Sequence, residues 1–252
     1  MKTGIEGKVA LVTGGARDVG REIALTLAAE GATVAINYNS SPDEAEAVAE
    51  LVRSNGGKAA AFKADVSDYA QVQAMVAAVA KAFGRIDILI NNAGLVKRDR
   101  FVDTTPSDWA SQIGVGLYGV IHTCHAVAPL MIGQKSGGRI INMVGDSARV
   151  GENGLAITAA SRGGVLALTK SLARELGRAN VTANVVALGL MNTAHTDPEW
   201  LNANLDKILR NYSIRRIGEA SDVGPMVTFL ASEHASWITG QVISVNGGFS
   251  MV

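Results

Sequence analysis

The 252-residue sequence predicts an α/β fold in which helices cover both faces of a doubly wound parallel sheet. Two observations predict it. Short apolar runs alternate, almost to the end of the chain, with segments whose apolar residues recur at helical spacing. The apolar runs are continuous, which is typical of parallel strands buried on both faces. A third observation, the lack of any linker or low-complexity tract, predicts a single domain over residues 1–252.

The elements follow in order along the chain. We expect strands at Val9–Val12, Thr33–Tyr38, Lys58–Ala64, Ile86–Ile90, Gly138–Val144, Val181–Ala187 and Gln241–Val245. We expect helices at Arg21–Gly31, Ser41–Gly56, Asp68–Phe83, Leu155–Gly177 and Ala220–Ser232. A further long helix is predicted to begin at a cap formed by Ser107 or Asp108. The segment Met191–Asn211 is irregular or helical, and a lid or substrate loop is expected at about 190–215.

Composition excludes several classes of partner. Lys and Arg balance Asp and Glu at 23 each, so we expect neither nucleic acid nor an anionic membrane surface. The single cysteine, Cys124, excludes an internal disulfide and fits the reducing cytoplasm. The start of the chain, Met1–Gly7, is too short and polar for a signal peptide.

One uncharged stretch, Trp109–Gln134, needs its own interpretation. It contains His122, His125 and Pro129, so we interpret it as a helix buried on most sides, at a subunit interface, and not as a membrane span. The two histidines share one helix face, but no third ligand is in sight, so no metal site is predicted.

The stretch Val9–Gly20 is the strongest functional signal. Four apolar residues run into Thr-Gly-Gly-Ala-Arg-Asp-Val-Gly, and a helical pattern follows. A helix start presents unpaired backbone N–H groups and positive partial charge, which suits a phosphate. Glycine lets the backbone approach the ligand closely. The strand–turn–helix context therefore predicts nucleotide binding, with a structural turn that binds nothing as the alternative.

Function in such a sheet is expected beyond the carboxyl ends of the strands. Asn91-Asn92-Ala93-Gly94 follows the fourth strand, and Ile238–Gly248 ends in Val-Asn-Gly-Gly. With the glycine turn, these residues resemble the short-chain dehydrogenase/reductase family, and within it the 3-oxoacyl-[acyl-carrier-protein] reductases. The resemblance extends from Gly7 to Gly248 and implies a Rossmann-like NAD(P)-binding fold, a small-molecule substrate and a homotetramer.

The resemblance also implies which residues would contact the cofactor. Gly14 and Gly20 would line the pyrophosphate turn, and Asp65 and Val66 would lie at the adenine. Residues at the ribose and nicotinamide would be Asn91, Ala93, Gly94, Arg162 and Thr193. The structural alternatives are that Asn91 ties neighbouring strands together and that Asp65 caps the next turn.

Charge favours NADP over NAD, although NAD stays possible. An NAD site usually places an acid after the second strand, but this strand ends Asn37-Tyr38-Asn39-Ser40. Arg17, in the glycine turn, could meet a 2′-phosphate. Asp18 stands where the family commonly has glycine. Its carboxylate either turns outward or partly fills the anion site.

The positions that carry the family's chemistry are all changed. The resemblance implies an asparagine, a serine, a tyrosine and a lysine, and this chain has Gly116, Gly145, Thr158 and Arg162 there. Thr158 is a poor acid at neutral pH, and Arg162 cannot relay a proton, though it could hold the cofactor ribose or clamp a carboxylate.

Other titratable groups could replace the lost ones. Asp146 follows the vacant serine position and could pair with Arg162 or act as a weak base, and His195 lies in the expected lid. Three functions therefore stay open. The chain is a nucleotide-binding pseudoenzyme without hydride transfer. Alternatively, it is a lyase, hydrolase or isomerase with altered proton-transfer chemistry. The third alternative is an NADP-dependent oxidoreductase that reduces a small carbonyl compound with a non-standard acid.

Overall fold

Seven parallel strands form one sheet in the computed structural model, which describes residues 2–194, 196 and 198–252. The strands are β1 (Val9–Val12), β2 (Thr33–Tyr38), β3 (Lys58–Lys63), β4 (Ile88–Asn91), β5 (Gly138–Gly145), β6 (Val181–Leu188) and β7 (Val242–Val245). Their order is β3-β2-β1-β4-β5-β6-β7, with every neighbouring pair parallel. The order reverses between β1 and β4, which confirms the doubly wound sheet and marks where a ligand should bind.

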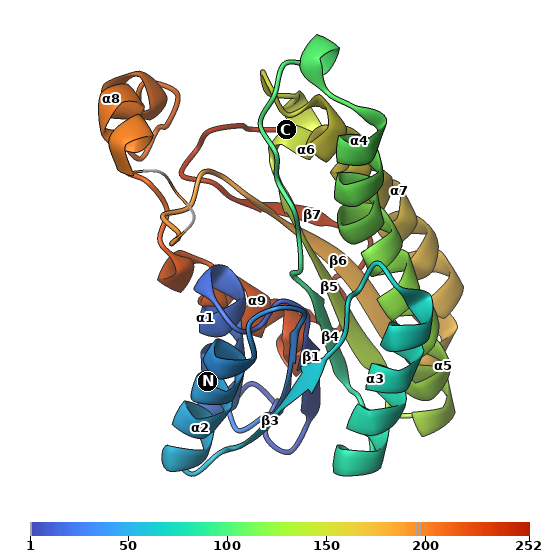
Figure 1. Cartoon of the computed structure of the whole chain (residues 1–252). Helices are drawn as coiled ribbons and strands as arrows, with labels where there is room; N and C mark the ends of the chain where they lie inside the picture. The colour runs from blue at the N-terminus through green and yellow to red at the C-terminus, as the bar shows by residue number, and fades with distance from the viewer. Residues whose placement is uncertain (1, 195, 197) are drawn as a thin grey trace.

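Helices cover both faces of the sheet (Figure 1). One face packs α1 (Asp18–Ala29), α2 (Pro42–Ser54) and α9 (Gly224–Ala231). The other packs α3 (Tyr69–Phe83), α5 (Gly119–Gln134) and α7 (Ala156–Leu176). The short helix α6 (Ser147–Val150) follows β5, and α8 (Pro198–Leu209) stands off from the sheet in Figure 1. Each face therefore has its own apolar core.

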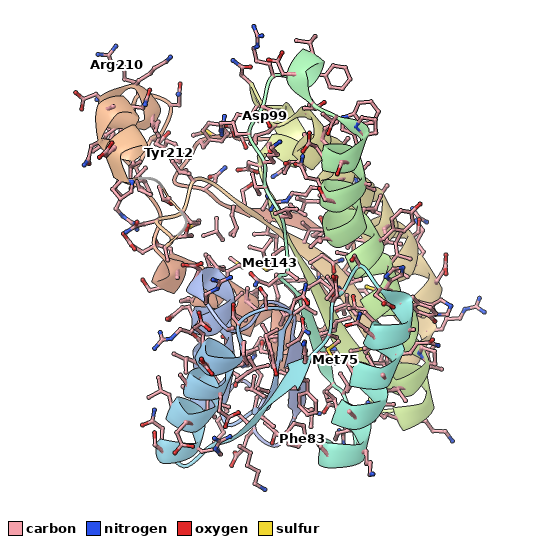
Figure 2. All side chains as sticks on the ribbon, viewed as in Figure 1. Met75, Phe83, Asp99, Met143, Arg210 and Tyr212 are labelled. Carbon is pink, nitrogen blue, oxygen red and sulfur yellow. The ribbon has the colours of Figure 1, made fainter. Side chains whose placement is uncertain are left out.

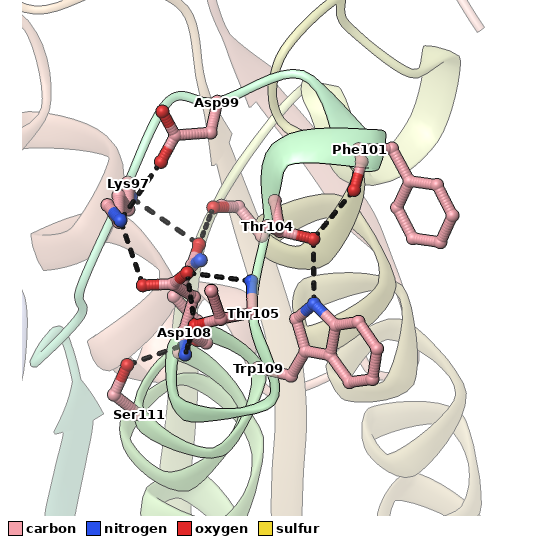
Figure 3. Close-up of polar contacts among 10 residues, drawn as sticks. Lys97, Asp99, Phe101, Thr104, Thr105, Asp108, Trp109 and Ser111 are labelled. Atoms are coloured by element: carbon pink, nitrogen blue, oxygen red, sulfur yellow. Dashed lines mark hydrogen bonds and ion pairs between the residues drawn. The ribbon is translucent and has the colours of Figure 1, made fainter.

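The long helix begins earlier than predicted. Its first part, α4 (Pro106–Ile113), has Thr105 as its N-cap, not Ser107 or Asp108. The Thr105 hydroxyl accepts from the backbone N–H of Asp108, and the Asp108 carboxylate accepts from the backbone N–H of Thr105 (Figure 3). This reciprocal capping box fits the preference of proline for the first helical position, here Pro106. Lys97 pairs with Asp108 at 2.9 Å and with Asp99 at 3.1 Å.

The helical run Pro106–Gln134 is long and apolar enough, by length and composition, to cross a membrane, with a mean hydropathy of 1.5 over its most apolar window. In the single chain 39% of that window is buried, so burial on most sides would require the expected subunit interface. Its inner side packs Val120, Val127 and Met131 into the core, while Tyr118 and Ile132 are exposed. A π-helical turn, Gly114–Tyr118, separates α4 from α5.

Several other boundaries differ by a few residues from the sequence prediction. The fourth strand begins at Ile88, two residues later than predicted, and the carboxylate of Asp87 just before it accepts from the Val9 backbone N–H and from Arg85. The last predicted helix is divided into a 3-10 turn, Ala220–Asp222, and α9, which starts at Gly224 with Pro225 in its first turn. Neither change moves a strand end at the switch point.

Candidate functional site

A cavity of about 870 Å³ opens at the carboxyl ends of the strands, on the side where α8 lies. The glycine turn after β1, the segment after β2 and the ends of β4, β5 and β6 form its walls, and residues of α8 face it from across the opening. Met143 in β5 and Tyr212 just after α8, both labelled in Figure 2, line it. The cavity lies at the switch point where the topology predicts a ligand.

The glycine turn owes its shape to close backbone contacts. A Cβ on Gly20 would lie 2.1 Å from the Gly14 carbonyl oxygen and 2.5 Å from the Asn92 amide nitrogen. The Asn92 amide itself donates to the carbonyl oxygens of Thr13 and Gly14, at 3.1 Å each. Gly14 has a φ of +60°, a region that glycine adopts readily. The turn is thereby held against the loop after β4, and both lie at the cavity wall.

Asp18 sits at the first residue of α1 with a φ of +49°. Aspartate tolerates this left-handed conformation better than most residues. Its carboxylate accepts from the backbone N–H of Ala194 at 2.8 Å, a residue 176 positions away in the loop after β6. The sequence left two alternatives, a side chain that turns outward or one that partly fills the anion site. In the structure Asp18 lines the cavity beside the start of α1, and its carboxylate joins the glycine turn to the loop after β6.

The end of β2 carries amides and hydroxyls in place of an acid. Asn37 is buried, accepts from the Gly14 backbone N–H at 3.3 Å and donates to the Ala64 carbonyl at 3.0 Å. Tyr38, Asn39 and Ser40 follow and line the cavity together with the exposed Arg17. The carboxylate of Asp65, which also lines the cavity, accepts from Asn39 at 3.3 Å.

The remaining predicted cofactor residues divide into two groups. Asp65, Val66, Ala93, Gly94, Arg162 and Thr193 all line the cavity. Asp65 also caps its own turn by accepting from the backbone N–H and hydroxyl of Ser67, at 2.8 and 2.7 Å. Asn91 is different, because its buried amide donates to Asn142 at 2.8 Å and accepts from Thr123 at 2.6 Å. The structure gives Asn91 the strand-tying role and places it outside the cavity lining.

At the catalytic end, Thr158 does not face the cavity. It is buried on α7 and donates to the Gln112 side chain of α4 at 2.6 Å. This placement does not fit the proton-donor role considered from the sequence. The space beside Gly116, in the π-helical turn, is occupied by the side chain of Ser161, whose hydroxyl would lie 2.6 Å from a Cβ at position 116.

The predicted pair of Asp146 with Arg162 is wrong. Asp146 is 1% exposed, and its carboxylate accepts from the Ser244 hydroxyl at 3.0 Å and from the Asn246 amide. Arg149 donates to the same Ser244 hydroxyl at 2.7 Å and to the Val252 carbonyl oxygen. Asp146 thus ties the end of β5 to the C-terminal segment and forms no hydrogen bond or ion pair with Arg162.

Arg162 projects from α7 into the cavity. A Cβ on Gly145 would lie 2.8 Å from its Nη1, and a Cβ on Gly94 would lie 3.2 Å from its Nη2. Within the described part of the chain, its guanidinium has no hydrogen bond or ion pair. Burial lowers the pKa of this guanidinium from its usual value.

Several lining residues were not predicted from the sequence. The Tyr212 hydroxyl accepts from the Leu190 backbone N–H at 2.8 Å, and burial raises the pKa of this phenol. Arg98, in the loop after β4, pairs with Glu152 at 2.5 Å and closes one wall. The predicted His195 lies outside the described residues. Among those described, no group of three His, Cys, Asp or Glu side chains is placed to hold a metal ion.

Comparison with known proteins gives consistent matches over nearly the whole chain. A family model described as enoyl-(acyl carrier protein) reductase matches residues 14–250. A 3-oxoacyl-[acyl-carrier-protein] reductase from Staphylococcus epidermidis is 41% identical over 245 residues, covering 97% of this chain and 99% of the relative. A reductase of the same name from Synechocystis is 38% identical over 250 residues, covering 99% of each.

Solved structures agree with the fold. A protein described as a short-chain alcohol dehydrogenase from Sinorhizobium meliloti has a TM-score of 0.94 at 31% identity, covering 99% of this chain and 98% of its own. A blue fluorescent protein from a metagenomic library, solved in complex with NADPH, has a TM-score of 0.90 at 34% identity, covering 98% and 99%.

Proposed function

Because the chain belongs to the short-chain dehydrogenase/reductase family, we propose that it binds NADP(H) in this cavity but does not transfer hydride by the family's tyrosine–lysine chemistry. One observation carries the proposal. The cavity keeps its glycine turn at one end, while at the other end the buried Thr158 donates to Gln112 and Arg162 replaces an amine. The chain is then a nucleotide-binding pseudoenzyme or an enzyme without a redox step.

The residues present fit a dinucleotide. The approach of the glycine turn to Ala93 is so close that a Cβ on Gly14 would lie 3.1 Å from the Ala93 Cα. The start of α1 offers N–H groups and positive partial charge for phosphate oxygens. Arg17 of the glycine turn lines the cavity together with Asn39 and Ser40, which follow β2, and the three would hold a 2′-phosphate, which favours NADP over NAD.

The chemistry of the other end limits what can follow binding. A bound nicotinamide would supply a hydride donor or acceptor. Carbonyl reduction also needs a proton donor near the carbonyl oxygen, and the Thr158 hydroxyl is already used by Gln112. The Asp146 carboxylate already accepts hydrogen bonds from Ser244 and Asn246. Proton transfer by an Asp146–Arg162 pair is therefore not supported, because Asp146 does not serve as its base.

A second candidate, an NADP-dependent carbonyl reductase with a non-standard acid, is favoured by the names of the curated relatives. These relatives are reductases that match nearly the full length of this chain. The acid would be Tyr212, because its hydroxyl accepts from Leu190 and keeps its own proton for a group in the cavity. Its raised pKa makes it a weaker acid than an ordinary tyrosine.

Titration with NADPH and NADH by calorimetry and by NADPH fluorescence tests the proposal. We expect NADPH to bind more tightly, and Arg17→Ala to weaken NADPH about tenfold without changing NADH, as expected for a charged hydrogen bond. Arg21→Ala, one turn further along in α1 and outside the cavity lining, is the matched control. Absence of nucleotide binding would refute the proposal, and NADPH oxidation with a carbonyl compound that Tyr212→Phe abolishes would establish the second candidate.

We also propose the homotetramer that the family resemblance implies. Its support is the set of exposed large apolar side chains on the long helix, Trp109, Tyr118 and Ile132, and the almost fully exposed Trp237. Such surfaces are typical of protein–protein contacts. Light scattering after size exclusion tests it, and a monomer at all concentrations would refute it.

A further inference from the structure

We propose that the cavity binds a ligand carrying a carboxylate, held by the Arg162 guanidinium and the Ser147 hydroxyl beside the end of β5. The inference rests on the proposed function, because it places this ligand in the same cavity as the nucleotide. It adds the chemical class of the second ligand and the two side chains that recognise it.

The position of the guanidinium is the first observation. Its Nη1 lies beside Gly145 at the end of β5, and its Nη2 lies beside Gly94 in the loop after β4. A Cβ added to Gly145 would lie only 2.8 Å from Nη1, and a Cβ added to Gly94 would lie 3.2 Å from Nη2. Side chains at either glycine would displace Arg162. The two glycines therefore make room for a planar cation that spans the cavity between two strand ends, with two terminal nitrogens available as donors.

The missing counter-charge is the second observation. Asp146, the nearest carboxylate in sequence to this strand end, is held by Ser244 and Asn246, and Glu152 is held by Arg98 at 2.5 Å. Neither carboxylate pairs with the Arg162 guanidinium, and no other group in the described structure forms an ion pair or hydrogen bond with it. Removing a charge from water without a partner is costly, and an arginine does not escape this cost by losing its proton. An anion from solution would supply the partner.

The Ser147 hydroxyl is the third observation. Ser147 is buried and lines the cavity, and its hydroxyl lies 3.4 Å from the position of a Cβ on Gly145, the same position that lies 2.8 Å from Nη1. Across the part of the chain that the structure describes, no hydrogen bond involves this hydroxyl. It is the first residue of the four-residue helix α6, so its backbone is fixed while its hydroxyl remains available.

The donor set selects the chemical class. One guanidinium presents two parallel N–H groups that match the two oxygens of a carboxylate, and the hydroxyl adds a third donor from the side. Met143 and Tyr212 line the same cavity, of about 870 Å³, and would contact the remainder of the ligand.

Calorimetry with acetoacetate and butyrate, each compared with its uncharged methyl ester, tests the inference on the free protein and on the protein saturated with NADP⁺. We expect each carboxylate to bind at least tenfold more tightly than its ester in both states. Arg162→Met should remove this preference, Arg162→Lys should keep part of it, and Ser147→Ala should reduce it severalfold. Lys170→Met, which removes an exposed charge from the same helix, should leave it unchanged.

Equal binding of acid and ester, no binding of either, or a preference that survives Arg162→Met would overturn the inference. A preference seen only in the free protein would also overturn it, because the guanidinium would then belong to the cofactor. The NADPH titration separates the two proposals: intact NADPH binding with no carboxylate preference refutes only this inference. Unaltered melting temperatures of the variants show that the fold is retained.

Discussion

Replacing Asp18 with glycine should strengthen NADPH binding. The carboxylate of Asp18 lies at the first residue of α1, on the cavity wall, where the start of the helix would otherwise attract a phosphate. Glycine adopts the local φ of +49° without strain, so the turn should keep its shape. The substitution removes a negative charge from the anion end of the cavity and also the hydrogen bond to Ala194.

The size of the effect follows from Coulomb's law. A carboxylate and a phosphate about 5 Å apart repel by roughly 0.8 kcal/mol in water and by about 3 kcal/mol at an effective dielectric constant of 20. Asp18 is half-buried, so an intermediate value of about 1–2 kcal/mol applies. This corresponds to about 5- to 30-fold tighter binding of NADPH.

Calorimetric titration of Asp18→Gly and Asp18→Asn measures the effect. Asparagine keeps the left-handed conformation and an oxygen that can accept from Ala194, so it isolates the charge from the loop contact. Both variants should bind more tightly, and the gain should shrink at high salt. If neither variant changes the dissociation constant, the phosphate does not bind beside Asp18, and the reasoning fails.

Three further predictions concern catalysis, the turn and pH. Restoring the family's four residues should give measurable NADPH oxidation with a carbonyl compound. The Ser161 hydroxyl, 2.6 Å from the Cβ that asparagine brings to position 116, can turn to another rotamer to make room. No oxidation by a folded, NADPH-binding quadruple variant would contradict this. Gly20→Ala should lower the free energy of unfolding in urea by about 1–3 kcal/mol, because the added methyl group overpacks against the Gly14 carbonyl. Gly133→Ala, whose Cβ would meet open space, should be neutral or stabilising. Similar unfolding free energies for the two variants would count against the close contact at Gly14. Thermal stability should fall as the pH drops from about 4 to 2, because Lys97 and Arg216 lower the pKa of Asp108 and of Asp222, respectively, from 3.8 to about 2. The stabilisation by each carboxylate is complete above about pH 4 and is lost as the pH falls through the pKa of the folded state. Asp108→Asn and Asp222→Asn should each make the melting temperature depend less on pH in this range, and an unchanged slope would refute the assignment.

The strands and the switch point could be predicted from sequence because their signals are local. Continuous apolar runs such as Val34–Ile36 are buried on both faces, and the structure pairs them as expected. The start of α4 was missed for a local reason too: Pro106 favours the first helical position, which makes Thr105 the cap and Asp108 its capping-box partner.

The errors at the site come from contacts that sequence spacing does not report. Asn91 ends β4, but successive side chains of a strand point to opposite faces, and its amide enters the core while Asn92 reaches the glycine turn. Asp146 and Arg162 are close in sequence, yet the partners of Asp146 are Ser244 and Asn246, which arrive from about 100 positions later. Only the assembled sheet shows that the guanidinium is left without a carboxylate.

The bonds from the end of β5 to the C-terminal segment also set the order in which the molecule can be completed. Asp146 and Arg149 hold residues 244, 246 and 252, so this wall of the cavity cannot form on the ribosome until these residues have emerged. The β1–β2–β3 half, with its glycine turn, needs none of these residues for its strand pairing. During synthesis, the half that would hold the adenine can therefore fold first, and the wall beside Arg162 is completed only when residues 244–252 arrive.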